Sequence, residues 1–130
     1  MSDQESVEDL LDCAVQDFRA AQSFVDVNPK HIKDHIYCGH LHGCVEKLVK
    51  AVLRASKVSY PRKHDIHHLF TILGNNGRQV PENFAPLTGL TIFATEARHG
   101  YRVPGQIDRA WFLNLVLELA AWLDPTINLE

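Results

Sequence analysis

Three basic side chains in the middle of the sequence are spaced so that they could bind a phosphate. Lys47, Lys50 and Arg54 follow one another at steps of three and four residues, which places them in a narrow arc of one helix face. Cations grouped in this way bind phosphate because each contributes positive charge and hydrogen-bond donors. The alternative is a solvent-exposed face, on which Glu46 and Lys50 form a helical ion pair in the favourable order.

A second basic cluster lies just before another predicted helix. Arg62, Lys63 and His64 precede Asp65, where we expect the helix to begin. Free N–H groups at a helix N-terminus attract anions, so this cluster is a candidate for half of a phosphate site. The alternative is structural, with His64 and Asp65 capping the helix and tying the loop to its neighbour.

A third candidate lies where a later helix is expected to end. Arg98 closes that predicted helix and Tyr101 follows in the turn. An arginine beside an aromatic ring can bind a phosphate and stack on a base. An arginine near a helix C-terminus also stabilises the helix dipole without any further function, and the sequence leaves both interpretations open.

Four potential metal ligands share one face of the second predicted helix. His31, His35, Cys38 and His42 follow at steps of four, three and four residues. Such a stripe spans about 16 Å at 1.5 Å per residue, so one ion would reach a neighbouring pair and need a second helix for the rest. No partner pattern is evident elsewhere. We therefore expect polar histidines at the rim of the core, no metal site and no other cofactor.

Two glycines interrupt the same predicted helix. Gly39 and Gly43 are four residues apart, and glycine inside a helix costs about 1 kcal/mol relative to alanine. They indicate a close approach of another helix or room for a ligand, although simple tolerance within a long helix is the alternative.

The composition limits the class of protein. With 130 residues, of which 45% are hydrophobic, we expect a single globular domain over residues 1–130. The formal charge of −3 favours a local phosphate-binding patch over wholesale electrostatic binding of nucleic acid. No apolar run is long enough for a membrane span, and the acidic, polar start is unlike a secretory signal. Three cysteines without a Cys-x-x-Cys motif indicate reduced thiols in the cytoplasm.

Apolar residues at three- and four-residue steps predict five helices, and strand signals are almost absent. The expected helices are Val7–Phe24, Pro29–Ser56, Asp65–Leu73, Pro86–Arg98 and Gln106–Leu123. Long helices joined by short connections pack antiparallel. We therefore expect an all-α fold, an up-and-down four-helix bundle with an additional short helix. The last helix is apolar most of the way round, which favours a central position or a subunit interface.

Four stretches of the sequence resemble those of the HEPN domain family. They are Asp17-Phe18-x-x-Ala21, Glu46-Lys47-x-x-Lys50-Ala51-x-Leu53, His64-Asp65-Ile66-x-x-Leu69, and Arg98 with Tyr101 and Pro104, a loosened form of the family's Arg-Tyr-Pro. Their order and spacing cover nearly the whole chain.

The resemblance implies a helical bundle that is usually a homodimer and that binds a nucleotide or RNA. Many prokaryotic members form a toxin–antitoxin pair with a small nucleotidyltransferase, which makes such a protein a possible partner. The residues expected to bind the nucleotide or phosphate are Lys47, Lys50, His64, Arg98 and Tyr101.

Whether the chain is an enzyme is left open by the same resemblance. Ribonuclease members carry Arg-x(4–6)-His close to the last helix, where Arg98 stands here without a following histidine at that spacing. Arg62 has that spacing to His67 or His68, but at the start of an earlier helix. The first hypothesis is therefore a nucleotide- or RNA-binding protein. The alternatives are a metal-independent ribonuclease using His64 and Arg98, a metal-binding bundle and a structural helical adaptor.

Overall fold

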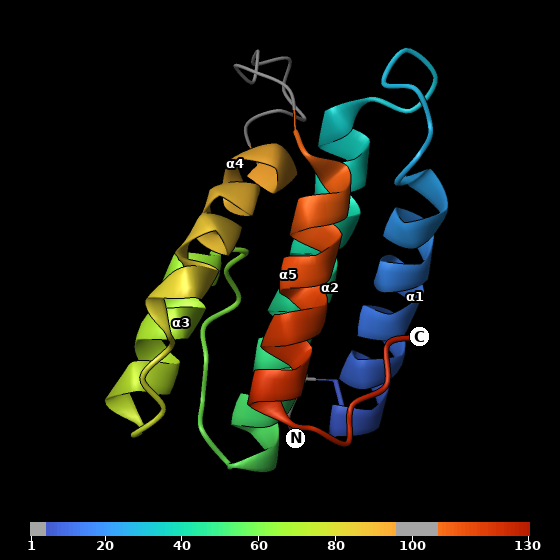
Figure 1. Cartoon of the computed structure of the whole chain (residues 1–130). Coiled ribbons are helices and arrows are strands. Elements are labelled where there is room, and N and C mark those ends of the chain that lie inside the picture. Colours follow the sequence, from blue (N-terminus) through green and yellow to red (C-terminus); the bar gives the residue numbers. More distant parts are fainter. Residues whose placement is uncertain (1–4, 96–106) are drawn as a thin grey trace.

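The protein is a helical bundle, as the sequence predicts (Figure 1). The computed structural model describes residues 5–95 and 107–130, and every regular element in that part of the chain is a helix. The elements are α1 (Val7–Phe24), α2 (Asp34–Ala55), α3 (Ile66–Asn75), the 3-10 helix η1 (Glu82–Gly89), α4 (Leu90–Thr95) and α5 (Arg109–Leu123). Within the described ranges, none of these helices combines the length and apolar character needed to cross a membrane.

Within the residues that the structure describes, three of the helices begin at side-chain caps. Ser6, Asp65 and Asp108 each accept a hydrogen bond from the backbone N–H three residues later, at 3.1, 3.3 and 3.0 Å. Each cap satisfies one of the N–H groups that the first helical turn leaves without a partner. The predicted first helix, with Ser6 as its cap, is confirmed at both ends.

Helix α2 begins later than the sequence predicts. We expected it from Pro29, but it starts at Asp34, and His31 lies in a turn before it. The reason is local: Asn28 Oδ1 accepts a hydrogen bond from Lys30 N at 2.9 Å, and the Asn28 carbonyl accepts from His31 N at 2.8 Å. These bonds close a turn that competes with the first turn of a helix.

The expected helix from Pro86 to Arg98 divides into two elements. Pro86 lies inside η1, and the α-helix begins only at Leu90. Proline has no N–H to donate to the preceding turn, which favours the tighter 3-10 geometry around it. The predicted end of this helix at Arg98 and the predicted start of the last helix at Gln106 lie outside the described residues.

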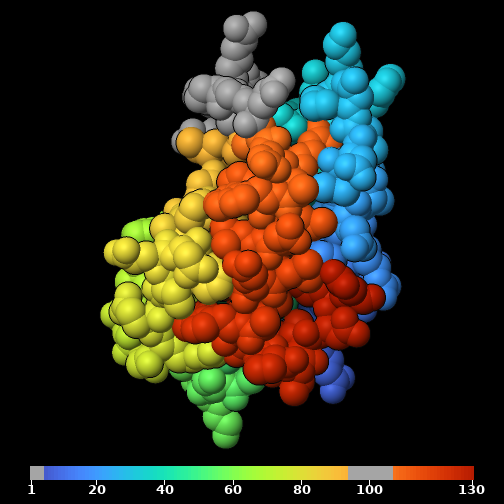
Figure 2. All heavy atoms as spheres, in the orientation of Figure 1, coloured from blue at the N-terminus to red at the C-terminus, as the bar shows by residue number. Residues whose placement is uncertain are grey.

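Helix α5 packs on α2 with one side and meets solvent with the other. Figure 2 shows it along the middle of one face, with the C-terminal segment beside its lower end. Leu115, Val116 and Leu119 are buried, whereas the Trp111 side chain is 48% exposed. The central helix is therefore α2, which contacts α1, α3, α4 and α5.

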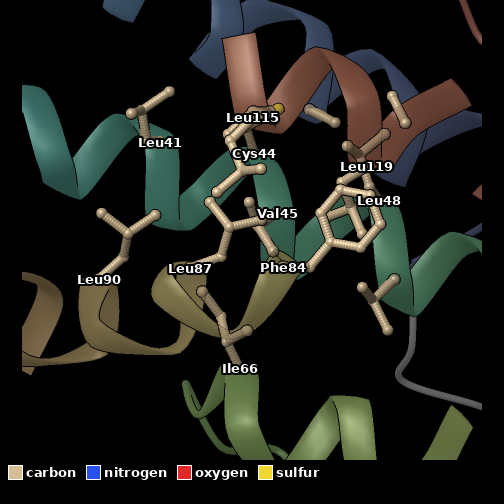
Figure 3. Close-up of a cluster of buried hydrophobic side chains, with 14 of the residues drawn as sticks. Leu41, Cys44, Val45, Leu48, Ile66, Phe84, Leu87, Leu90, Leu115 and Leu119 are labelled. Carbon is tan, nitrogen blue, oxygen red and sulfur yellow. The ribbon is translucent and has the colours of Figure 1, made fainter. Parts of the chain in front are cut away.

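The core forms where the inward faces of these helices meet (Figure 3). The apolar side chains that recur at three- and four-residue steps along α2 are buried from Tyr37 to Leu48, and their face reaches the surface at Ala55. The labelled side chains come from α2 (Leu41, Cys44, Val45, Leu48), α3 (Ile66), η1 (Phe84, Leu87), α4 (Leu90) and α5 (Leu115, Leu119).

A buried arginine ties the start of α5 to the connection between α1 and α2. Arg109 is 6% exposed, and its guanidinium donates to Asp34 Oδ1 at 2.8 Å, to the Phe24 carbonyl at 2.7 Å and to the Ile32 carbonyl at 2.6 Å. The ring of Tyr37 lies 5.0 Å from the guanidinium carbon, and its hydroxyl donates to the Arg109 carbonyl at 2.7 Å. These contacts hold the helix ends in register.

The two glycines of α2 face different surroundings. A Cβ atom added at Gly43 would lie 2.5 Å from Asp17 Oδ2, so α1 approaches α2 closely there. A Cβ added at Gly39 would meet nothing within 4 Å. The structure thus confirms a close approach at Gly43, whereas the open space at Gly39 agrees both with room for a ligand and with simple tolerance of glycine in a long helix.

We predict that alanine has different effects at these two positions. Gly39→Ala should raise the free energy of unfolding by up to about 1 kcal/mol, because alanine restricts the unfolded chain and clashes with nothing. Gly43→Ala should be less stable than Gly39→Ala by about 1 kcal/mol or more, because it displaces the Asp17 carboxylate from its partners. Urea unfolding of both variants measures the difference, and equal stabilities would contradict the close approach of α1.

Candidate functional site

A buried carboxylate lies at the centre of the candidate site. Glu46 is 4% exposed, and Lys50 Nζ donates to its Oε1 at 2.8 Å, the helical pair that the sequence predicts. His64, from the loop before α3, places its Nδ1 2.9 Å from both carboxylate oxygens. His42, one turn earlier on α2, has its Nδ1 3.6 Å from Oε2. Three side chains, two from α2 and one from the loop before α3, thus surround one charge.

These contacts keep Glu46 ionised and set the orientation of His64. Burial alone raises the pKa of the Glu46 carboxyl, but the hydrogen bonds from Lys50 and His64 outweigh it and leave that pKa below its ordinary value. A charged carboxylate can only accept hydrogen bonds, so His64 Nδ1 must donate. In a neutral ring His64 Nε2 is then the acceptor, on a side chain that is 70% exposed.

A second carboxylate, from α1, holds two further residues of α2. Asp17 Oδ1 lies 3.1 Å from His40 Nδ1, and Asp17 Oδ2 lies 3.7 Å from Lys47 Nζ. The close approach at Gly43 places Asp17 there. The His40 ring also contacts the ring of Phe24, at 6.0 Å between centroids.

Two adjoining hollows follow this face of α2, and together we call them the α2 groove. The first has a volume of about 410 Å³ and the second about 510 Å³, and both are lined by Glu46, Lys47 and His64. The first hollow is also lined by Asp17, His35, Ile36, Gly39, His40, His42 and Gly43, and the second by Glu5, Leu10, Lys50, Tyr60 and Arg62.

The structure brings together three of the five residues expected to bind phosphate. Lys47, Lys50 and His64 all line the groove, whereas Arg98 and Tyr101 lie outside the described residues. Lys50 Nζ lies 5.6 Å from the centroid of the Tyr60 ring, an aromatic wall that the sequence analysis did not identify.

Asp17 is another site residue that the sequence analysis missed. It belongs to one of the stretches that resemble the family, but nothing in its own spacing predicted a contact with α2. The available signal was Gly43, which indicated a close approach without naming the side chain that makes it.

The four potential metal ligands of the sequence do not lie on one face of α2 as a set. His31 is exposed in the turn before α2, and His42 is buried rather than at the rim of the core as we expected. Burial, with Asp34 nearby, raises the pKa of the Cys38 thiol to about 12, which disfavours the thiolate that a metal needs. Within residues 5–95 and 107–130, no group of three or more His, Cys, Asp or Glu side chains could hold a metal ion.

A comparison with protein families identifies the fold. The model of the HEPN domain matches residues 7–123. The chain belongs to the HEPN family. No individual curated protein and no solved structure matches it. Three of the stretches that resemble HEPN proteins contribute Asp17, the Glu46–Lys50 segment and His64, and these meet at the α2 groove although they lie far apart in the sequence.

His42 makes the stability of this HEPN protein sensitive to pH. Its side chain is 3% exposed, and its Nε2 has no well-formed hydrogen bond among the described residues, although the backbone of His64 lies near. Burial lowers the pKa of His42, and this effect outweighs the attraction of Glu46. Folding therefore favours the neutral ring.

We predict that the free energy of unfolding decreases as the pH falls below about 6.5, the ordinary pKa of histidine. In that range the unfolded chain binds a proton at residue 42 that the folded chain does not, so acid favours unfolding. The free energy of unfolding continues to fall until the pH reaches the lowered pKa of His42 in the folded protein. In urea unfolding at a series of pH values, His42→Gln should flatten this part of the profile. The exposed His68→Gln is the control, and an unchanged profile for His42→Gln would contradict the assignment.

Proposed function

We propose that this HEPN protein binds a phosphate group of a nucleotide or RNA in the α2 groove. Membership of the family supports a nucleotide- or RNA-related function. The observation that carries the proposal is the gathering of Lys47, Lys50 and His64 along one groove, around the carboxylate of Glu46. Arg98 and Tyr101 contribute a further cation and an aromatic ring in this proposal.

The carboxylates of the groove hold the two lysines in place but occupy only part of the hydrogen-bond donors of each ammonium group. Glu46 accepts one hydrogen bond from the Lys50 ammonium, which carries three protons. Lys47 Nζ lies 3.7 Å from Asp17 Oδ2, which is an ion pair rather than a hydrogen bond. Both ammonium groups therefore retain donors for a phosphate, and each contact of this kind is worth about 1.5–3 kcal/mol.

The proposal includes the partners that the family resemblance implies. We propose a homodimer that acts in the cytoplasm, and a small nucleotidyltransferase as its partner in a toxin–antitoxin-like module. The exposed Trp111 and Ile92, at 48% and 47%, provide apolar surface for a subunit contact.

We predict that Lys47→Gln, Lys50→Gln and Arg98→Gln each weaken binding of a mixed-sequence single-stranded RNA by about tenfold or more, because each removes a charged contact to phosphate. Fluorescence anisotropy with a labelled oligonucleotide measures the affinity, which should also fall as salt is added.

The control is Lys30→Gln, which removes the same charge from an exposed turn outside the groove. Circular dichroism checks that helicity is unchanged, which matters for Lys50 because its loss leaves Glu46 with one partner fewer. An RNA affinity that changes neither with the groove substitutions nor with salt would contradict the proposal and favour a structural adaptor.

A metal-independent ribonuclease is the second candidate, and the pairing of Glu46 with His64 favours it. A carboxylate that holds one imidazole nitrogen and leaves the other exposed is an arrangement used for general acid–base catalysis. The cations of the groove would stabilise the charge that develops on the phosphate. His64 would then take the role that the Arg-x(4–6)-His motif, absent from its usual place, has in other members.

We predict for this candidate that the purified protein cleaves RNA in the presence of a chelator and leaves a 2′,3′-cyclic phosphate. His64→Gln should slow cleavage by about 100-fold or more, the usual contribution of a general acid–base group. His68→Gln, on the exposed side of α3, should cleave like the unaltered protein. Intact RNA after incubation with the unaltered protein would exclude this candidate and leave binding as the function.

A further inference from the structure

The two hollows of the α2 groove meet at the same three residues. Glu46, Lys47 and His64 line both, so a ligand that passes from one hollow to the other must pass these side chains. With volumes of about 410 and 510 Å³, each hollow alone falls in the size range of a small-molecule site, roughly 300–1,000 Å³.

We infer that the α2 groove binds two consecutive nucleotides of a single strand, with one base on each side of His64 and the phosphate between them at Lys47 and His64. The inference rests on the proposed function and adds the length of the ligand to it. A mononucleotide would fill one hollow and leave the other empty.

The second hollow provides an aromatic wall for one base. The Tyr60 ring lies beside the Lys50 ammonium, 5.6 Å from its centroid, and Leu10 contributes apolar surface to the same hollow. Bases stack on aromatic rings without regard to sequence, because every base presents a flat face.

The first hollow provides a second ring and open space beside α2. Its wall includes the His40 ring, which Asp17 and Phe24 hold in place. Gly39 also lines this hollow, and an added Cβ there would meet nothing within 4 Å. A base therefore has room to enter there, on the side of His64 opposite Tyr60.

The length of the groove also favours two nucleotides over one. From Gly39 to Lys50 the helix axis advances about 16 Å at 1.5 Å per residue, whereas stacked nucleotides of one strand advance about 3.4 Å each. A strand must extend to place its bases in separate hollows. A single strand can do this, because its bases are free to leave the stack.

The experiment compares a mononucleotide with a dinucleotide by isothermal titration calorimetry on the full chain. The probes are adenosine monophosphate and its 5′-phosphorylated adenylyl dinucleotide, with 2′-O-methyl groups so that cleavage cannot interfere. We expect the dinucleotide to bind about 5- to 150-fold more tightly, the range that stacking of one base provides.

Substitutions then locate the second base. Gly39→Leu fills the first hollow and should bring the ratio of the two affinities close to one, whereas Gly89→Leu should leave the ratio unchanged. Gly89 is the matched control, because an added side chain also meets open space there and it does not line the groove. Should circular dichroism show that Gly39→Leu is misfolded, His40→Leu, which removes the wall of the same hollow, provides the test.

Each outcome decides between the two proposals. Equal affinities of the two probes for the unaltered protein, or a ratio that survives filling of the first hollow, would overturn the inference while leaving phosphate binding intact. Failure of both probes and of the single-stranded RNA to bind would instead overturn the proposed function, and the inference with it.

Discussion

The ionised Glu46 carboxylate inside the bundle is the constraint on which the arrangement of the site depends. A buried charge without partners costs several kcal/mol, so the fold must bring compensating groups to it. Lys50 lies one helical turn away on α2, while His64 must come from the loop that leads into α3. That loop is therefore held against α2 by the hydrogen bonds from His64 to the carboxylate, while the His64 side chain stays 70% exposed beside the groove.

The bundle contains a second buried charge, Arg109, whose surroundings differ from those of Glu46. Arg109 is also buried, but backbone carbonyls of the α1–α2 connection and the carboxylate of Asp34 satisfy its guanidinium. Those partners connect elements of the bundle, and none of them lines the α2 groove. Two partners of Glu46, Lys50 and His64, instead line the groove. Their contacts with Glu46 therefore both support the fold and place a cation and an imidazole beside the groove.

The sequence predicted what depends on neighbours within a helix and missed what depends on packing between helices. The extent of α1 and the pairing of Glu46 with Lys50 follow from caps and four-residue spacing, and both are confirmed. The contacts of Asp17 with His40 and Lys47 arise where two helices cross, a geometry that periodicity does not specify. The late start of α2 has a local cause rather than one in the packing between helices. The hydrogen-bonded turn at Asn28 replaces the first part of the predicted helix.

The paired charges of the groove bear on the kind of anion that fits it. Lys50 and Lys47 each lie beside a carboxylate. The carboxylates weaken the positive field of the two ammonium groups, and they also restrain the lysine side chains. Side chains already held in place lose less conformational entropy when they bind, which offsets part of the weaker attraction. A highly charged group such as a triphosphate would meet Asp17 and Glu46 as well as the lysines, and like charges at short range repel. For the phosphate binding that we propose, these charges therefore favour the single charge of a phosphodiester, which needs a few well-placed donors rather than a strong positive field.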